Sequence, residues 1–180
     1  MQKSIIIAGS GGQGILFLGR VLTSASMLEK KEVTWFPSYG AEMRGGTANC
    51  TVIISDEMIG SPVVMMSDML IVMNRASLDR FLPSLRKKGM LFYDSSLITE
   101  KLARKDVTAV PVPSTNMAGD MGNPKSANMV MLGAFIAKTG ILRKRSIFSI
   151  FDGATDPRKI EAFRVNKELV RKGIDYIENT

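Results

Sequence analysis

The chain has 180 residues, of which 45% are hydrophobic and 23% charged, and its formal net charge is +7 at pH 7. This length and composition predict one globular domain, residues 1–180, that needs no metal or disulfide framework for stability. The absence of histidine excludes a Ser-His-Asp triad and a histidine-ligated metal, and the single cysteine, Cys50, cannot hold an iron–sulfur cluster.

The apolar patterning divides the chain into alternating elements. Segments typical of strands are 4–8, 33–36, 47–55, 68–73, 90–93 and 107–112. Segments typical of helices are 15–28, a stretch from about residue 77, 127–138 and 156–178. This alternation predicts an α/β fold of the Rossmann-like kind, with a mostly parallel sheet and helices on both of its faces. A turn at Asp56–Pro62 predicts an antiparallel hairpin over residues 47–62, either as an insertion or at an edge of the sheet.

The first loop is rich in glycine and lies between a strand and a helix. It contains the candidate binding residues Gly9, Gly11, Gly12, Gln13 and Gly14. Small residues allow the backbone to approach a ligand closely, and a helix N-terminus presents free N–H groups and the positive end of its dipole. The loop therefore predicts an anion-binding edge.

The glycine spacing does not by itself predict a dinucleotide site. Such a site needs an acidic residue near the end of the second strand to hold the ribose, and this strand ends in Phe36-Pro37-Ser38. Gly14 is followed by Ile15 and not by a lysine, which excludes a P-loop. A phosphate, a carboxylate or the backbone of a partner remains as the occupant.

Two further loops carry polar residues that we expect at the same edge. Residues 37–46 contain Tyr39, Glu42, Arg44 and Gly45, and the carboxyl ends of parallel strands open onto one crevice. Arg44 suits a phosphate or carboxylate, with Glu42 orienting it; the alternative is a Glu–Arg surface pair.

The third polar loop precedes the helix at 127–138. It supplies Asn123, Lys125 and Asn128, whose side chains carry amide and ammonium donors. A helix N-cap at Ser126 would explain part of this loop but not Lys125 or Asn128.

The last helix carries two apolar stripes that are too far apart for one docking face. The stripes are Ile160, Phe163, Val170, Ile174 and Ile177, and Ala162, Val165, Leu169 and Tyr176. We expect one stripe to pack on the sheet and the other to meet a partner; the alternative is a groove within the same domain.

The positive charge and the absences limit the partners and the location. Basic residues occur in separate clusters without interleaved aromatic residues, which favours an acidic partner, an anionic cofactor or a solvated surface over nucleic acid. Met1 leads directly into a strand-like segment, and no apolar run is long enough to span a membrane. We expect a cytoplasmic protein with no membrane association.

Four ordered blocks together resemble the gamma subunit of the 2-oxoacid:ferredoxin oxidoreductases, especially those of the 2-oxoglutarate (2-ketoglutarate) type. The blocks are Gly11–Gly14, Pro37–Cys50, Gly60–Pro62 and the region of Asn123, Lys125 and Asn128–Ala134. The longest block, Pro37–Cys50, is the most specific, and the resemblance covers nearly the whole chain.

The resemblance implies a subunit that acts within a complex. The family decarboxylates a 2-oxoacid oxidatively with coenzyme A and passes the electrons to ferredoxin. Thiamine diphosphate and iron–sulfur clusters are then expected on alpha and beta subunits, with a delta subunit as a further candidate partner. This chain is expected to bind no cofactor alone and to supply no catalytic residue, but to lie near coenzyme A.

Two other functions remain open from the sequence. A free-standing nucleotide-binding protein would be monodisperse and bind NAD or a mononucleotide. A docking module without a part in the reaction would leave its partners fully active when removed.

Overall fold

The structure is a computed structural model, and it describes residues 1–38, 47–100, 102, 104–153 and 157–180. The predicted residues Tyr39, Glu42, Arg44 and Gly45 therefore lie outside the described residues. Within the described ranges, no helix is both long and apolar enough to cross a membrane.

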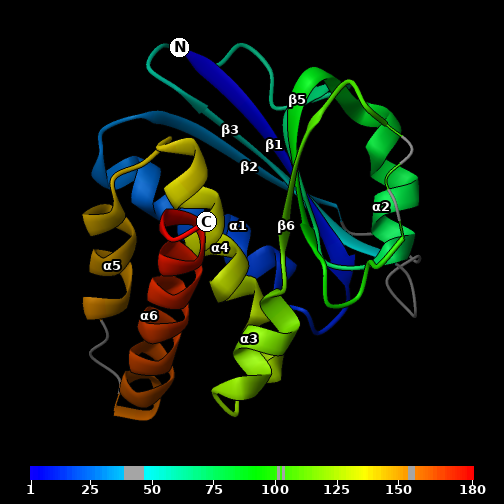
Figure 1. Ribbon diagram of the computed structural model, residues 1–180. Coiled ribbons are helices and arrows are strands. Elements are labelled where there is room, and N and C mark those ends of the chain that lie inside the picture. The colour runs from blue at the N-terminus through cyan, green and yellow to red at the C-terminus, as the bar shows by residue number, and fades with distance from the viewer. Residues whose placement is uncertain (39–46, 101, 103, 154–156) are drawn as a thin grey trace.

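A mixed sheet forms the centre of the molecule (Figure 1). In the described part of the chain it has six strands in the order β2-β3-β1-β4-β5-β6. Their bounds are β1 Gln2–Ser10, β2 Glu32–Ser38, β3 Thr47–Ser55, β4 Ser67–Val72, β5 Leu85–Asp94 and β6 Thr108–Val112. The β1–β4, β4–β5 and β5–β6 pairs are parallel, which confirms the predicted α/β class.

The antiparallel part of the sheet differs from its predicted position. β3 pairs antiparallel with β2 on one side and with β1 on the other, so it is an interior strand. Residues 47–62 do not form a hairpin, because the strand that follows the irregular segment after Ser55 is β4, which pairs with β1. The hairpin partner of β3 is instead β2, the preceding strand.

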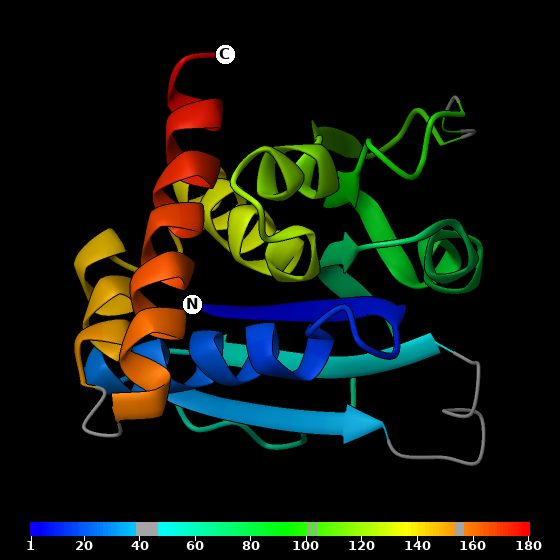
Figure 2. The ribbon, with the colours of Figure 1, turned by 90° about the horizontal axis from the view of Figure 1, so that it is seen from below.

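Helices cover both faces of the sheet, but unequally (Figures 1 and 2). One face carries most of them, and the described helix on the other face is α2, extended by the short 3-10 turn Leu82–Ser84. The helices are α1 Ile15–Leu28, α2 Arg75–Phe81, α3 Ser114–Asp120, α4 Ala127–Thr139, α5 Lys144–Asp152 and α6 Pro157–Glu178. Both α3 and α5 fall in segments where no helix was predicted.

The first strand explains this two-sided arrangement. Ile5 and Ile7 point into the larger core beneath α1 and α4, whereas Ile6 and Ala8 point into the smaller core beneath α2. Alternate residues of a strand face opposite sides of the sheet, and helices cover both sides here, so all four side chains are buried. In the larger core, the rings of Phe92 and Phe135 meet edge to face, with centroids 5.0 Å apart.

The last helix does not pack on the sheet as predicted. α6 lies outside α4 and beside α5, so it forms a third layer (Figure 2). Its Val170 and Ile174 are buried in the larger core, and Phe163 meets the ring of Phe151 on α5 edge to face. Most residues of both stripes therefore pack against α4 and α5 of the same domain, as the alternative expected. Ile160 and Ala162 stay exposed.

Candidate functional site

The glycine loop lies at the carboxyl edge of the parallel strands. Gly12 and Gly14 have φ values of +89° and +69°, a left-handed backbone that favours glycine. Gly14 is the N-cap of α1, and among the described residues no side chain bonds to the free N–H groups of its first turn. The N-terminal end of α1, with the positive end of its dipole, is therefore available to an anion.

Gln13 holds this loop in place. Its side-chain oxygen accepts from the N–H of Ser10 at 2.7 Å, and its side-chain nitrogen donates to the carbonyl of Met73 at 3.0 Å. The amide predicted to face a ligand thus ties the end of β1 to the end of β4. In this geometry Gln13 positions the loop.

Asn74 strengthens the same connection. Its Nδ2 donates to Ser10 Oγ at 2.5 Å, and its Oδ1 accepts from the N–H of Ser77 at 2.8 Å, which caps α2. Two loops and the start of a helix are therefore hydrogen-bonded together at this corner of the sheet. Asn74 was not predicted; its signal in the sequence was an asparagine just after a strand, three residues before the serine whose N–H it accepts from.

Asn128 brings the third predicted loop to the glycine loop. Its buried Nδ2 donates to the carbonyl of Gly14 at 3.0 Å, so the N-terminal ends of α1 and α4 are neighbours. Lys125 is exposed and has no carboxylate partner in the described ranges, while Asn123 donates to the carbonyl of Met121 at 2.8 Å. The structure thus joins Asn128 to the glycine loop and leaves Lys125 available beside α4.

The second predicted loop can be placed only by its ends. Ser38 closes β2, and Thr47 opens β3 opposite Ser10 of the glycine loop. Ser38 and Thr47, which flank residues 39–46, therefore both lie at the predicted edge. Thr47 Oγ1 also accepts from Arg80 of α2 at 3.0 Å, a cation that no local sequence signal marked.

Asp94, the last residue of β5, lies at the same edge of the sheet, beside α3. Its buried carboxylate accepts from Ser96 N–H at 3.0 Å and from the hydroxyl of Thr115 at 2.5 Å. These bonds join the end of β5 to α3. Asp94, which was not predicted, holds the edge together with its carboxylate already engaged.

The sheet order also bears on dinucleotide binding. In a dinucleotide-binding fold, the strand after the first helix lies parallel and adjacent to the first strand and carries the ribose-binding acid. Here β3 separates β2 from β1, and β2 ends in Ser38. The arrangement therefore does not support the nucleotide-binding alternative.

Cys50 lies beneath this site and does not open onto it. The side chain is fully buried, with its sulfur 3.9 Å from the carbonyl oxygen of Ile15, and burial raises the pKa of its thiol to about 12. The residue fills the core between β3 and α1.

Known proteins resemble this chain over three quarters of its length or more. The family of pyruvate ferredoxin/flavodoxin oxidoreductases matches residues 4–176. The 2-oxoglutarate synthase subunit KorC of Methanocaldococcus jannaschii is 34% identical over 179 residues, which cover 96% of both chains. The ketoisovalerate oxidoreductase subunit VorA of Methanothermobacter thermautotrophicus is 42% identical over 136 residues, and this chain spans only 28% of that subunit.

Two solved structures share the fold. The gamma subunit of a keto/oxoacid ferredoxin oxidoreductase from Geobacter sulfurreducens superposes with a TM-score of 0.83 and 27% identity over 99% of both chains. The 2-oxoglutarate:ferredoxin oxidoreductase from Magnetococcus marinus gives a TM-score of 0.90 at 24% identity, covering 99% of this chain and 31% of that one. The same architecture therefore occurs both as a separate subunit and within a longer chain.

Proposed function

The chain belongs to the pyruvate ferredoxin/flavodoxin oxidoreductase family, and we propose that it is the gamma-type subunit of a 2-oxoacid:ferredoxin oxidoreductase. The observation that most supports this proposal is the match to KorC along 96% of both chains. The complex would convert a 2-oxoacid and coenzyme A into an acyl-CoA and carbon dioxide, with the electrons passing to ferredoxin. Thiamine diphosphate on a partner subunit would supply the carbanion chemistry.

We favour 2-oxoglutarate as the substrate, with succinyl-CoA as the product. The relatives named 2-oxoglutarate synthase subunits match this chain almost end to end. A branched-chain 2-oxoacid is the second candidate, because the ketoisovalerate oxidoreductase subunits are 41–42% identical over the part that they share.

The part that this chain would play is to help bind coenzyme A. The uncapped N-terminus of α1 and the exposed Lys125 lie at one edge, which the bond from Asn128 to Gly14 holds together, and Ser38 and Thr47, which flank the segment containing Arg44, lie at the same edge. Such donors suit the phosphates of coenzyme A. The Magnetococcus marinus enzyme was solved with coenzyme A and succinyl-CoA bound. The reactive thioester would form on a partner subunit.

Purification from the native host tests the assignment. A tag on this chain should recover brown partner subunits, and the preparation should reduce a viologen dye anaerobically when both 2-oxoglutarate and coenzyme A are added. Replacing 2-oxoglutarate by pyruvate or by a branched-chain 2-oxoacid identifies the substrate. A colourless chain that elutes alone and binds NAD in calorimetry would contradict the assignment.

Two substitutions test the coenzyme A edge in the intact complex. Arg44→Ala and Lys125→Ala should each raise the KM for coenzyme A about 3–10-fold, because each would remove a cation proposed to bind its phosphates, while the KM for the 2-oxoacid stays unchanged. The matched control is Lys172→Ala, an exposed lysine on α6 away from this edge. An unchanged KM for coenzyme A in both variants would rule out this edge as the binding site.

A further inference from the structure

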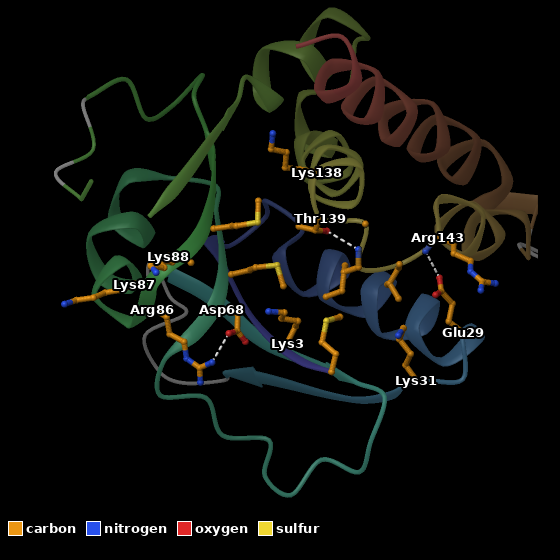
Figure 3. A pocket seen from close by; sticks show the side chains of 17 residues that line it. Lys3, Glu29, Lys31, Asp68, Arg86, Lys87, Lys88, Lys138, Thr139 and Arg143 are labelled. Atoms are coloured by element: carbon orange, nitrogen blue, oxygen red, sulfur yellow. Dashed lines mark hydrogen bonds and ion pairs between the residues drawn. The ribbon is translucent and has the colours of Figure 1, made fainter. Parts of the chain in front are cut away.

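A cleft of about 580 Å³ opens at the other end of the sheet from the glycine loop (Figure 3). The amino ends of β1, β4 and β5 and the C-terminal ends of α1 and α4 line it. Among its described lining residues, seven are lysine or arginine and two are acidic, a net of +5 in a chain whose formal net charge is +7. Cations from separate sequence clusters thus gather in this basic cleft.

A bulge in the pairing of β4 with β5 places three of these cations at the cleft. Between the pairs Ser67–Leu85 and Met69–Met90, β4 advances by two residues and β5 by five, so residues 86–89 leave the ladder. This bulged segment contains Arg86, Lys87 and Lys88. Lys88 has a φ of +62°, a conformation that lysine rarely adopts, and its N–H donates to the carbonyl of Asp106 at 2.7 Å. The bulge holds consecutive cations at the cleft at a cost in backbone strain.

The two acidic lining residues do not neutralise the remaining cations. Asp68 is bonded to Arg86 at 2.8 Å and to the hydroxyl of Ser4 at 2.8 Å, and Glu29 accepts from the backbone N–H of Arg143 at 2.7 Å. In the described ranges, Lys3, Lys138 and the guanidinium of Arg143 have no carboxylate within ion-pair distance. Those three charges are therefore open to an external anion.

The shape of the cleft favours an extended occupant. Lys87, Lys138 and Arg143 lie on different sides of the opening and do not converge on one point (Figure 3). Buried apolar side chains, among them Met69, Ile141 and Leu142, line the cleft between them. A small phosphate would need converging donors, and none of the described lining residues is an aromatic that could stack on a base. Several carboxylates spread along a peptide, with an apolar side chain between them, complement this pattern.

We propose that the basic cleft docks an acidic, apolar-anchored segment of a partner subunit in the same complex. This inference rests on the proposed function, since it assigns an assembly role to the edge opposite the coenzyme A site. One subunit would thus bind coenzyme A at one end of its sheet and a neighbouring subunit at the other.

Zero-length crosslinking tests the contact directly. A carbodiimide joins lysine amines to carboxylates that already touch them, so Lys3 or Lys138 in the intact complex should crosslink to Asp or Glu of a partner subunit. Mass spectrometry identifies the linked peptides. A complex in which neither lysine links to a partner, while other lysines of the chain do, would overturn the proposal.

Charge reversal tests whether the contact matters for assembly. Lys138→Glu combined with Arg143→Glu should weaken binding of the purified partner subunits at least about tenfold and flatten the dependence of the Kd on salt. The matched control is Lys105→Glu with Lys172→Glu, an equal charge change at two exposed lysines outside the cleft. Equal Kd values for the two double variants, with unchanged thermal midpoints, would contradict the proposal.

The outcomes separate this inference from the proposed function. If the wild-type chain binds no partner, the subunit assignment itself fails. If the wild-type and cleft variants assemble equally well and support the same activity, only the docking proposal fails. Calorimetry with pyrophosphate is a further test. If the wild-type chain binds pyrophosphate and the double variant of the cleft does not, the cleft is a small-anion site and not a docking site.

Discussion

At the scale of single residues, Gly14 is the point where the site is most constrained. Its φ is +69°, and a Cβ added there would lie 2.3 Å from Nδ2 of Asn128, the group that bonds to its carbonyl. The backbone and the neighbour therefore require glycine for independent reasons.

Gly14→Ala should consequently lower the free energy of unfolding by about 2 kcal/mol. Gly11→Ala is the control, because its φ is not left-handed and a Cβ there would meet no described atom within 4 Å. We expect the control to change stability by less than about 0.5 kcal/mol. Urea unfolding of both variants measures the difference, and equal midpoints would contradict this geometry.

Cys50 should behave as a buried apolar residue. Burial raises the pKa of its thiol to about 12, so at pH 8 almost none of it is the reactive thiolate in the folded chain. A thiol reagent at pH 8 should label the folded protein only as fast as it unfolds, and should label it at once in guanidinium. Immediate labelling of the folded chain would show that the thiol is exposed.

At the scale of elements, the crossing of α4 and α6 depends on two small residues. A Cβ on Gly173 would lie 1.9 Å from the carbonyl oxygen of Val130, and one on Gly133 would lie 2.0 Å from that of Val170. Because the atoms they would meet belong to backbone, the helices cannot adjust without separating.

Gly173→Ala should therefore destabilise the fold by about 3 kcal/mol, in spite of the higher helix propensity of alanine. Gly119→Ala in α3 makes the same change in a helix where a Cβ meets no described atom within 4 Å. That control should be neutral or gain up to about 1 kcal/mol. Thermal unfolding compares the two, and a stable Gly173→Ala variant would mean that α6 packs elsewhere.

The elements that the sequence predicted are those with strong local patterns. The strand at 47–55 and the helix that starts at 15 were predicted with their observed bounds, because apolar runs and glycine boundaries mark them. The helix α5 was missed although Ile147 and Phe151, four residues apart, form a local apolar face that packs against α1 and α6. The pairing of β3 with β1 was also missed, because these strands are separated in the sequence by α1 and β2 and no local pattern shows which strands pair.

In the candidate site, too, features with a local sequence pattern could be predicted, and long-range contacts could not. Loops rich in glycine and asparagine identified the edge, and the bond from Asn128 to Gly14 joins two of them. The side chains that brace the edge, Asn74 and Asp94, bond across 64 and 21 residues. No local pattern could reveal those partners.

At the scale of the whole molecule, the two ends of the sheet differ in chemistry. The carboxyl edge presents helix N-termini and glycine backbone, and the amino edge gathers a net charge of +5 over an apolar lining. This polarity suits a subunit that meets an anionic ligand at one end and a partner at the other.

Omitting this chain from the complex shows whether the chain takes part in the reaction. Partner subunits would be purified without it and assayed anaerobically for succinyl-CoA formation from 2-oxoglutarate and coenzyme A, before and after the pure chain is added back. We expect little or no succinyl-CoA without the chain and recovery of activity at a stoichiometric addition. Full activity in its absence would refute the role of a required subunit and would identify the chain as a docking module with no part in the reaction.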